Sequence, residues 1–174
     1  DHGIVNTLER FTAEAPATDL LVTTLLPRYF HAGAVHDGKV YLMGGLTPLP
    51  DASCGVALRH ADDFEEFDPA TGAVRSMPKM PLAVARPGAA MIGDRLYVIG
   101  GSTESEARTA AVQIYDFVTG EWTRGADMPV AREGAVAESG GKIYAPGGYD
   151  GAVALRDFQV YEPQADRWEK LPDL

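Results

Sequence analysis

A pair of adjacent glycines recurs three times along this chain, and it constrains the possible fold more than any other feature. Each pair follows a short apolar stretch whose second residue is a tyrosine. A period of about 50 residues indicates a repeat architecture, in which each unit buries its apolar surface against its neighbours. The three pairs are Gly44-Gly45, Gly100-Gly101 and Gly147-Gly148.

An aromatic residue opens a turn-forming sequence downstream of each glycine pair. The three sequences begin Phe67-Asp68-Pro69, Tyr115-Asp116-Phe117 and Tyr161-Glu162-Pro163. A second apolar residue follows each aromatic at a fixed spacing, and each unit then ends in Met-Pro or Leu-Pro. These later positions are Val74, Trp122 and Trp168, followed by Met80-Pro81, Met128-Pro129 and Leu171-Pro172.

Short turn sequences separate two apolar segments ahead of every glycine pair. Asp37-Gly38, Gly93-Asp94 and Gly140-Gly141 are two-residue turns of the kind that join antiparallel strands. The glycine pairs allow a positive φ or a close backbone approach where a strand meets a loop. Tyrosine and tryptophan suit outer strands, where a large ring covers the gap between twisted sheets while its polar atom finds a partner.

The ordered set of arginine, small-residue strand, glycine pair, aromatic-Asp-Pro turn and tryptophan resembles the kelch repeat over nearly the whole chain. The resemblance implies an all-β fold, a kelch-type β-propeller of four-stranded antiparallel blades, and a ring of six or seven blades. We expect an outer half-blade over residues 1–27 and three blades over 28–81, 82–129 and 130–174. The first of these blades carries a loop insertion at 46–61.

The half-blade at the start of the chain raises the question of how the ring closes. Residues 6–11 resemble the third strand of the later units, and a fourth strand is expected around Leu20–Thr24. Propellers commonly close by pairing such outer strands with inner strands from the other end of the ring. The sequence therefore predicts that further sequence of a larger domain, or another chain, completes the ring.

Charge and composition exclude several kinds of partner. The net charge of −10 opposes binding to nucleic acid and to anionic membranes, because such binding depends on lysine and arginine. No apolar run approaches the length of a membrane span or a signal peptide, so we expect a soluble protein. With Cys54 as the single cysteine, no intrachain disulfide is possible and the compartment stays open between cytoplasm and exterior. The alanine-rich, acidic composition would suit a bacterial source.

Arginines precede the expected innermost strand of each blade. In kelch proteins that bind acidic peptides, equivalent arginines line the pocket, and the planar guanidinium group suits a carboxylate. The resemblance therefore makes Arg28, Arg86 and Arg132 candidate ligand-binding residues. Alternatively, these arginines pair with acidic side chains or backbone carbonyls and lock the blades together.

The residues after the glycine pairs should emerge on the same face as the arginines. Tyr149 is the best single candidate among them, because an aromatic anchor buries a large area at small entropic cost. Ser102 and Leu46 occupy the same position in the other two units. The insertion adds a long loop on a rigid scaffold, a frequent carrier of specificity, and contains Pro48, Pro50, Asp51, Cys54, Arg59 and His60.

Enzyme interpretations fit the sequence less well than a binding module does. Copper radical oxidases of this family need paired histidines, tyrosines and a cysteine near the axis, whereas Cys54 and His31, His36 and His60 show no such spacing. A sugar-isomerising propeller of the sialate type would need a general base, for which Glu133 is the one candidate. Alternation along a strand would split the acidic run at 62–66 between two faces, which argues against calcium.

We therefore expect a kelch binding module that presents a loop face to a protein segment or small acidic ligand, with no catalytic residue, metal or cofactor. The sugar isomerase and a purely structural module of a larger assembly remain the alternatives.

Overall fold

The computed structural model describes residues 8–10, 19–22, 25–49 and 57–174, and every regular element in them is a β-strand. Three four-stranded antiparallel sheets follow one another along the chain. Blade A contains β3 (Ala32–His36), β4 (Lys39–Met43), β7 (Phe64–Asp68) and β8 (Ala73–Ser76). Blade B contains β9 (Gly88–Ile92), β10 (Arg95–Ile99), β11 (Val112–Asp116) and β12 (Glu121–Gly125). Blade C contains β13 (Ala137–Ser139), β14 (Lys142–Pro146), β15 (Phe158–Glu162) and β16 (Arg167–Leu171).

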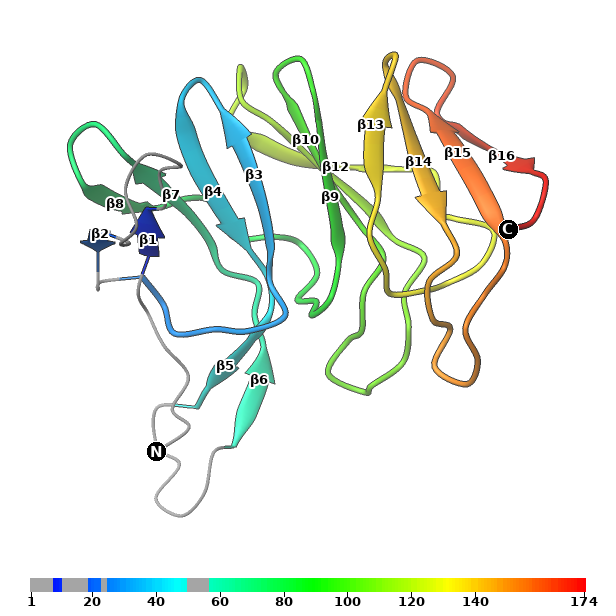
Figure 1. The fold of residues 1–174 in the computed structure, drawn as a ribbon, viewed down its shortest axis with the longest axis horizontal. Coiled ribbons are helices and arrows are strands. Elements are labelled where there is room, and N and C mark those ends of the chain that lie inside the picture. Colours follow the sequence, from blue (N-terminus) through cyan, green and yellow to red (C-terminus); the bar gives the residue numbers. More distant parts are fainter. Residues whose placement is uncertain (1–7, 11–18, 23–24, 50–56) are drawn as a thin grey trace.

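Two smaller strand pairs accompany the blades. β1 (Leu8–Arg10) pairs with β2 (Asp19–Val22) beside blade A, where the sequence predicts the outer half-blade (Figure 1). β5 (Leu46–Pro48) pairs with β6 (Leu58–His60) inside the insertion, which is therefore a hairpin where we expected a loop. Pro50, Asp51 and Cys54 lie outside the described residues. The residue boundaries between blades stay a prediction.

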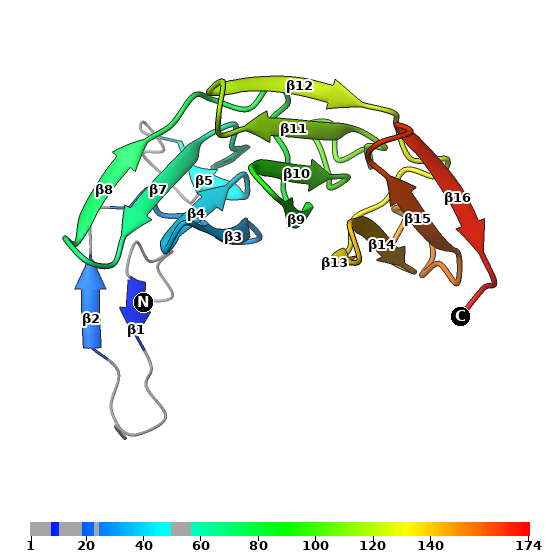
Figure 2. The same cartoon turned by 90° about the horizontal axis from the view of Figure 1, so that it is seen from above.

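The sheets stand side by side in an arc around a common centre (Figure 2). The inner strands β3, β9 and β13 line the concave side, and β8, β12 and β16 form the convex side. This is the blade arrangement of a β-propeller, as predicted. No helix in the described part of the chain is long and apolar enough to cross a membrane.

The local signals in the sequence account for this geometry. The register pairs His36 with Lys39, Ile92 with Arg95 and Ser139 with Lys142, so each predicted turn has two residues. The glycine pairs have positive φ throughout, for example 68° at Gly44 and 97° at Gly45. A Cβ atom on Gly45 would lie 2.7 Å from the carbonyl oxygen of Tyr29, so glycine is required there by space as well as by conformation.

The core lies between the blades. Tyr41, Met43 and Phe64 of blade A pack against Leu96 and Val98 of blade B, and Tyr97 and Ile99 pack in the same way against Ile143 and Tyr161 of blade C. Each tryptophan ties two blades together, as its amphipathic ring predicts. Trp122 donates its indole N–H to the carbonyl of Pro78 at 2.8 Å, and Trp168 donates to Ala126 at 2.9 Å.

Candidate binding site

The loops that follow the glycine pairs and those that enter the inner strands lie together at one end of the blades. This loop face comprises residues 26–31, 57–63, 82–87, 102–111, 130–136 and 149–157, and lies below the sheets in Figure 1. Within each blade, the residue after the glycine pair bridges to the strand entry. These bridges join Tyr29 to Leu46, Ala85 to Ser102 and Glu133 to Tyr149.

The bridges fix which residues of the three blades are equivalent. Arg28 precedes Tyr29 and Arg132 precedes Glu133, so these two arginines match. Arg86 follows Ala85, and its equivalents are Phe30 and Gly134. Val84 stands at the blade B position of Arg28 and Arg132. Arg86 precedes the inner strand of its blade, as expected, but it stands two residues after the repeat position that Arg28 and Arg132 occupy in their blades.

Arg28 and Arg132 are buried and bind groups of their own blade. Arg28 donates to the carbonyl oxygens of Gly44 at 3.2 Å and Asp63 at 3.1 Å, and forms an ion pair with Glu65. Burial lowers the pKa of Arg28, while the carboxylates of Glu65 and Asp63 act to raise it. These contacts agree with the alternative in that the arginines pair with acidic side chains and backbone carbonyls, but they act within one blade and do not join two blades.

Arg132 repeats this arrangement in blade C. Its guanidinium group donates to the carbonyl oxygens of Gly147 at 2.7 Å and Asp157 at 3.2 Å, and it pairs with the Asp157 carboxylate. Both arginines therefore present little charge to a ligand.

Arg86 is the candidate arginine that faces solvent. Its φ of 56° lies in the left-handed region, and its guanidinium carbon lies 4.0 Å from the centre of the Phe30 ring. It also lies 3.4 Å from the Ser102 hydroxyl and 3.9 Å from the Glu133 carboxylate. Strained backbone at a half-buried, charged residue is a feature of functional sites.

A second arginine, which the sequence analysis missed, completes the cluster. Arg108 lies 3.0 Å from the same Glu133 carboxylate, and its guanidinium carbon lies 5.2 Å from the Tyr149 ring. Glu133, the one candidate base, thus lies between two arginines as their shared counter-ion.

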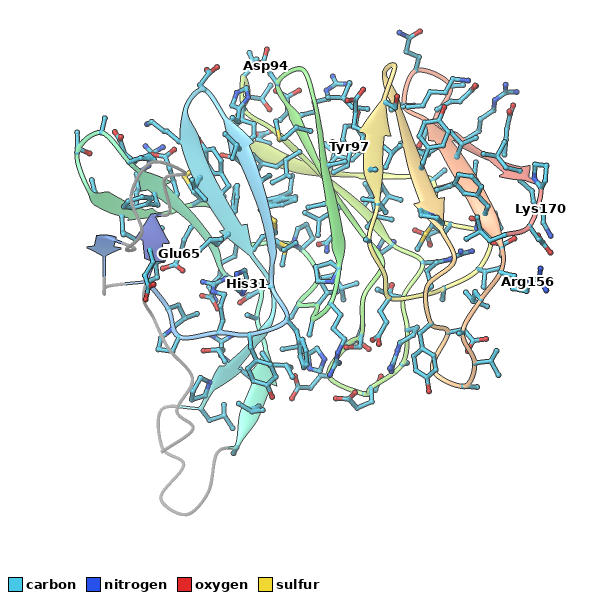
Figure 3. The ribbon with its side chains drawn as sticks, viewed as in Figure 1. His31, Glu65, Asp94, Tyr97, Arg156 and Lys170 are labelled. Carbon is cyan, nitrogen blue, oxygen red and sulfur yellow. The ribbon has the colours of Figure 1, made fainter. Side chains whose placement is uncertain are left out.

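An open pocket of about 480 Å³ lies at this cluster and is bordered by Phe30, Arg86, Glu133 and Tyr149. His31, labelled in Figure 3, also lines it. Phe30 is 47% exposed and Tyr149 is 37% exposed. We call this set of Phe30, Arg86, Arg108, Glu133 and Tyr149 the loop-face cluster.

Ser102 and Leu46 are buried and lie beneath the surface. The Ser102 hydroxyl lies 3.2 Å from Nε2 of His60, whose Nδ1 lies 3.2 Å from Glu104. This order of serine, histidine and carboxylate resembles a nucleophilic triad, but Ser102 is wholly covered and no substrate could reach it. The contacts instead fasten the β5–β6 hairpin to blade B, since Glu104 also accepts the backbone N–H of His60 at 2.8 Å. In the described part of the chain no group of three or more His, Cys, Asp or Glu residues could hold a metal ion.

The chain resembles known kelch proteins over most of its length. It is 31% identical to mouse Kelch-like protein 36 over 192 aligned positions, which span 100% of this chain and 28% of that protein. It is 28% identical to Beta-scruin of Limulus polyphemus, over 87% of this chain and 17% of that protein. It is 27% identical to Kelch-like protein terF of Aspergillus terreus, over 85% of this chain and 34% of that protein. The chain thus spans about a third or less of the length of these relatives.

A solved structure shares the fold. The structure of YjhT superimposes with a TM-score of 0.81 at 16% sequence identity, over 97% of this chain and 60% of that one. The model of the Kelch motif matches residues 27–81, 83–129 and 132–174. Since these matches cover most of the sequence and coincide with the three repeated units, the chain belongs to the kelch-repeat family.

Proposed function

We propose that this chain is a protein-binding module whose loop-face cluster holds an acidic segment of a partner. Kelch-repeat proteins generally mediate protein–protein interactions. The observation that carries the proposal is the charge of the cluster: Arg86 and Arg108 share the carboxylate of Glu133, and Asp150 beside the cluster also interacts with Arg108. The five cluster residues themselves carry one net positive charge, on a chain whose net charge is −10.

The surroundings of that charge favour a peptide carboxylate as its partner. Phe30 and Tyr149 present exposed rings beside the two guanidinium groups, and aromatic and arginine side chains are the most frequent energetic anchors of protein interfaces. Stacking on the rings also holds each guanidinium plane in place, which lowers the entropy lost when a carboxylate binds. A partner residue of Asp or Glu next to an apolar residue would match both parts of the cluster.

The test begins with a random peptide library displayed on phage and selected on the immobilised protein. We expect selected sequences to be enriched in Asp or Glu beside an apolar residue. Calorimetry on one selected peptide should then show about 10- to 100-fold weaker binding to Arg86→Ala and Arg108→Ala, because a charged hydrogen bond contributes about 1.5 to 3 kcal/mol. Arg95→Ala is the matched control, since Arg95 is an exposed arginine that pairs with Asp116 at the far end of blade B. Selected peptides without acidic residues, or undiminished binding to Arg86→Ala, would contradict the proposal.

We also propose that a further blade, from additional sequence or another chain, covers the outer face of blade C. Tyr41 and Tyr97 are 3% and 2% exposed beneath the next blade, whereas the equivalent Tyr144 stays partly exposed. An uncovered apolar sheet face of this kind is a site for association. Light scattering on the 174-residue chain should give a particle heavier than 18.6 kDa or an unstable monomer, and a stable monomer of that mass would rule the proposal out.

A further inference from the structure

A cavity lies between blades A and B at the end opposite the loop face. Its volume is about 640 Å³, and its walls come from the β3–β4 and β9–β10 turns together with β7, β8 and the β11–β12 turn. Asp94, labelled in Figure 3, marks this end of the molecule. We call this cavity the A–B cleft; it shares no residue with the loop-face cluster.

A buried, fully paired carboxylate forms part of its wall. The Glu66 side chain is 7% exposed and accepts hydrogen bonds from the Tyr41 hydroxyl at 2.8 Å, Lys39 at 3.1 Å and Arg75 at 2.9 Å. Burial alone would raise the pKa of Glu66, but these three donors outweigh it and lower the pKa. Glu66 is therefore ionised at neutral pH, and it fixes two cations at the wall.

The cleft between blades B and C shows that the fold does not need charged residues at the positions of Glu66 and Arg75. Glu66 lies opposite Tyr41 in the register and Arg75 opposite Glu66, and the matching residues of blade B are Ile114 and Thr123. That second cleft is smaller, at about 360 Å³, and packs with an apolar residue at the same place. Burying a charge is costly, and an apolar replacement often stabilises a protein equally well or better.

Two further positions differ between the clefts in the same direction. His36 of the A–B cleft corresponds to Ile92, and Phe117 corresponds to Pro163. The ring of His36 stacks on Phe117 with 4.3 Å between centroids, and its Nε2 lies 3.4 Å from Asp94 and 3.8 Å from Asp37. At these two positions the A–B cleft therefore has a histidine and a phenylalanine, where the cleft between blades B and C has an isoleucine and a proline.

The charges of the A–B cleft are separated between its wall and its rim. Lys39 and Arg75 outnumber Glu66 at the wall, and Arg75, 63% exposed, has donors to spare. Asp37 and Asp94 are exposed at the rim. A carboxylate fits the wall, whereas the two aspartates and the net charge of −10 disfavour a dianion and favour a ligand that also carries a cation.

We propose that the A–B cleft binds a small zwitterion of the amino-acid class, with its carboxylate on Lys39 and Arg75 and its ammonium group on Asp37 and Asp94. The stacked His36 and Phe117 form the apolar side against which the ligand's carbon chain packs. This site is separate from the proposed peptide surface and does not depend on it.

Binding of a graded series of ω-amino acids, from glycine to 6-aminohexanoate, tests the proposal. We expect saturation-transfer NMR and calorimetry to detect at least one member with a dissociation constant in the millimolar range or tighter. Hexanoate and hexylamine, which each carry one of the two charges, should bind at least tenfold more weakly. Absence of binding across the series, or equal binding of the singly charged analogues, would overturn the proposal.

Variants that copy the second cleft make the test specific. Glu66→Ile with Arg75→Thr installs the pair found in blade B, and we expect it to fold and to bind at least tenfold more weakly. Failure of this variant to fold would refute the premise that the charges are dispensable. Asp94→Asn and Arg75→Gln, both at exposed positions, should each weaken binding severalfold in a folded protein, and unchanged binding in both would count against the site. Arg86→Ala should leave zwitterion binding unchanged, which separates this site from the loop-face cluster.

Discussion

Two kinds of arginine occupy the loop face, and their surroundings give them opposite roles. Arg28 and Arg132 are buried, and each binds two backbone carbonyls and a carboxylate of its own blade. Arg86 and Arg108 lie on aromatic rings beside an open pocket and share Glu133. A recurring arginine in a repeat protein therefore indicates a binding role only after its position in the repeat is known.

The buried and the pocket-side arginines should differ most in how strongly their replacement lowers the stability of the protein. Arg132→Ala removes the buried ion pair with Asp157 and the hydrogen bonds to two backbone carbonyls, and only Gln159 and Lys170 then contact the Asp157 carboxylate, so we expect it to lower the free energy of unfolding by about 3 to 5 kcal/mol. Urea unfolding followed by circular dichroism measures this loss. A loss below about 1 kcal/mol would show that Arg132 does not hold blade C together.

Blade B supplies the control for this prediction. It has Val84 and Gln113 where blade A has Arg28 and Glu65, and the Gln113 side chain bonds the backbone N–H of Leu82 at 2.8 Å and its carbonyl at 3.1 Å. Arg28→Val with Glu65→Gln copies this pair and should cost much less than Arg28→Val alone, which leaves a carboxylate unpaired. Equal costs would mean that charge pairing is not the reason for the burial.

A smaller effect is expected in the acid range, at the carboxylate that Arg132 binds. Burial alone would raise the pKa of Asp157, but Arg132, Gln159 and Lys170 outweigh it and lower the pKa. A carboxyl group with a lowered folded-state pKa stabilises the protein above its unfolded pKa of about 4, and this stability is lost as the pH falls through the folded value.

Asp157→Asn should therefore show a weaker loss of stability than the parent protein between about pH 4 and pH 2. Unfolding curves at a series of pH values measure that slope. Asp127→Asn is the control, because Asp127 is exposed at the surface and pairs only with Arg124 among its described neighbours. Identical slopes for the parent and Asp157→Asn would contradict the pairing with Arg132.

The fold could be predicted from the sequence because its signals are local. Each glycine pair has the positive φ that its residue type allows, each two-residue turn closes the expected hairpin, and Trp122 and Trp168 find acceptors in the neighbouring blade. The insertion was harder, because β5 and β6 are three-residue strands without clear alternation.

The candidate site could be predicted only in part because it depends on contacts between blades. Tyr149 was identified from its place after a glycine pair, and it lies in the pocket. Phe30 and Arg108 were missed, since residues from different blades meet only after the arc is assembled. Arg86 was identified because it precedes an inner strand, which it does, but its position in the repeat differs from that of Arg28. It lacks the buried position of Arg28, and the shorter distance to its glycine pair was the one signal in the sequence.

The smallest effect on stability, and the sharpest contrast with Arg132, is expected at Arg86. Its stacking on the exposed Phe30 ring and its long 3.9 Å approach to Glu133 are weak interactions, each worth about 1 kcal/mol or less. Its left-handed backbone costs about 1 to 2 kcal/mol in any residue other than glycine, and blade C has Gly134 at this position.

Arg86→Gly removes the contacts and the backbone strain together, so we expect its free energy of unfolding to stay within about 1 kcal/mol of the parent protein. Arg86→Ala keeps the strain and should be less stable than Arg86→Gly by about 1 kcal/mol. Both variants should lose binding of the selected acidic peptide to the same extent, because both lack the guanidinium group. If Arg86→Gly were as destabilised as Arg132→Ala, the two kinds of arginine would not differ in role, and the strain at Arg86 would serve the fold instead of the pocket.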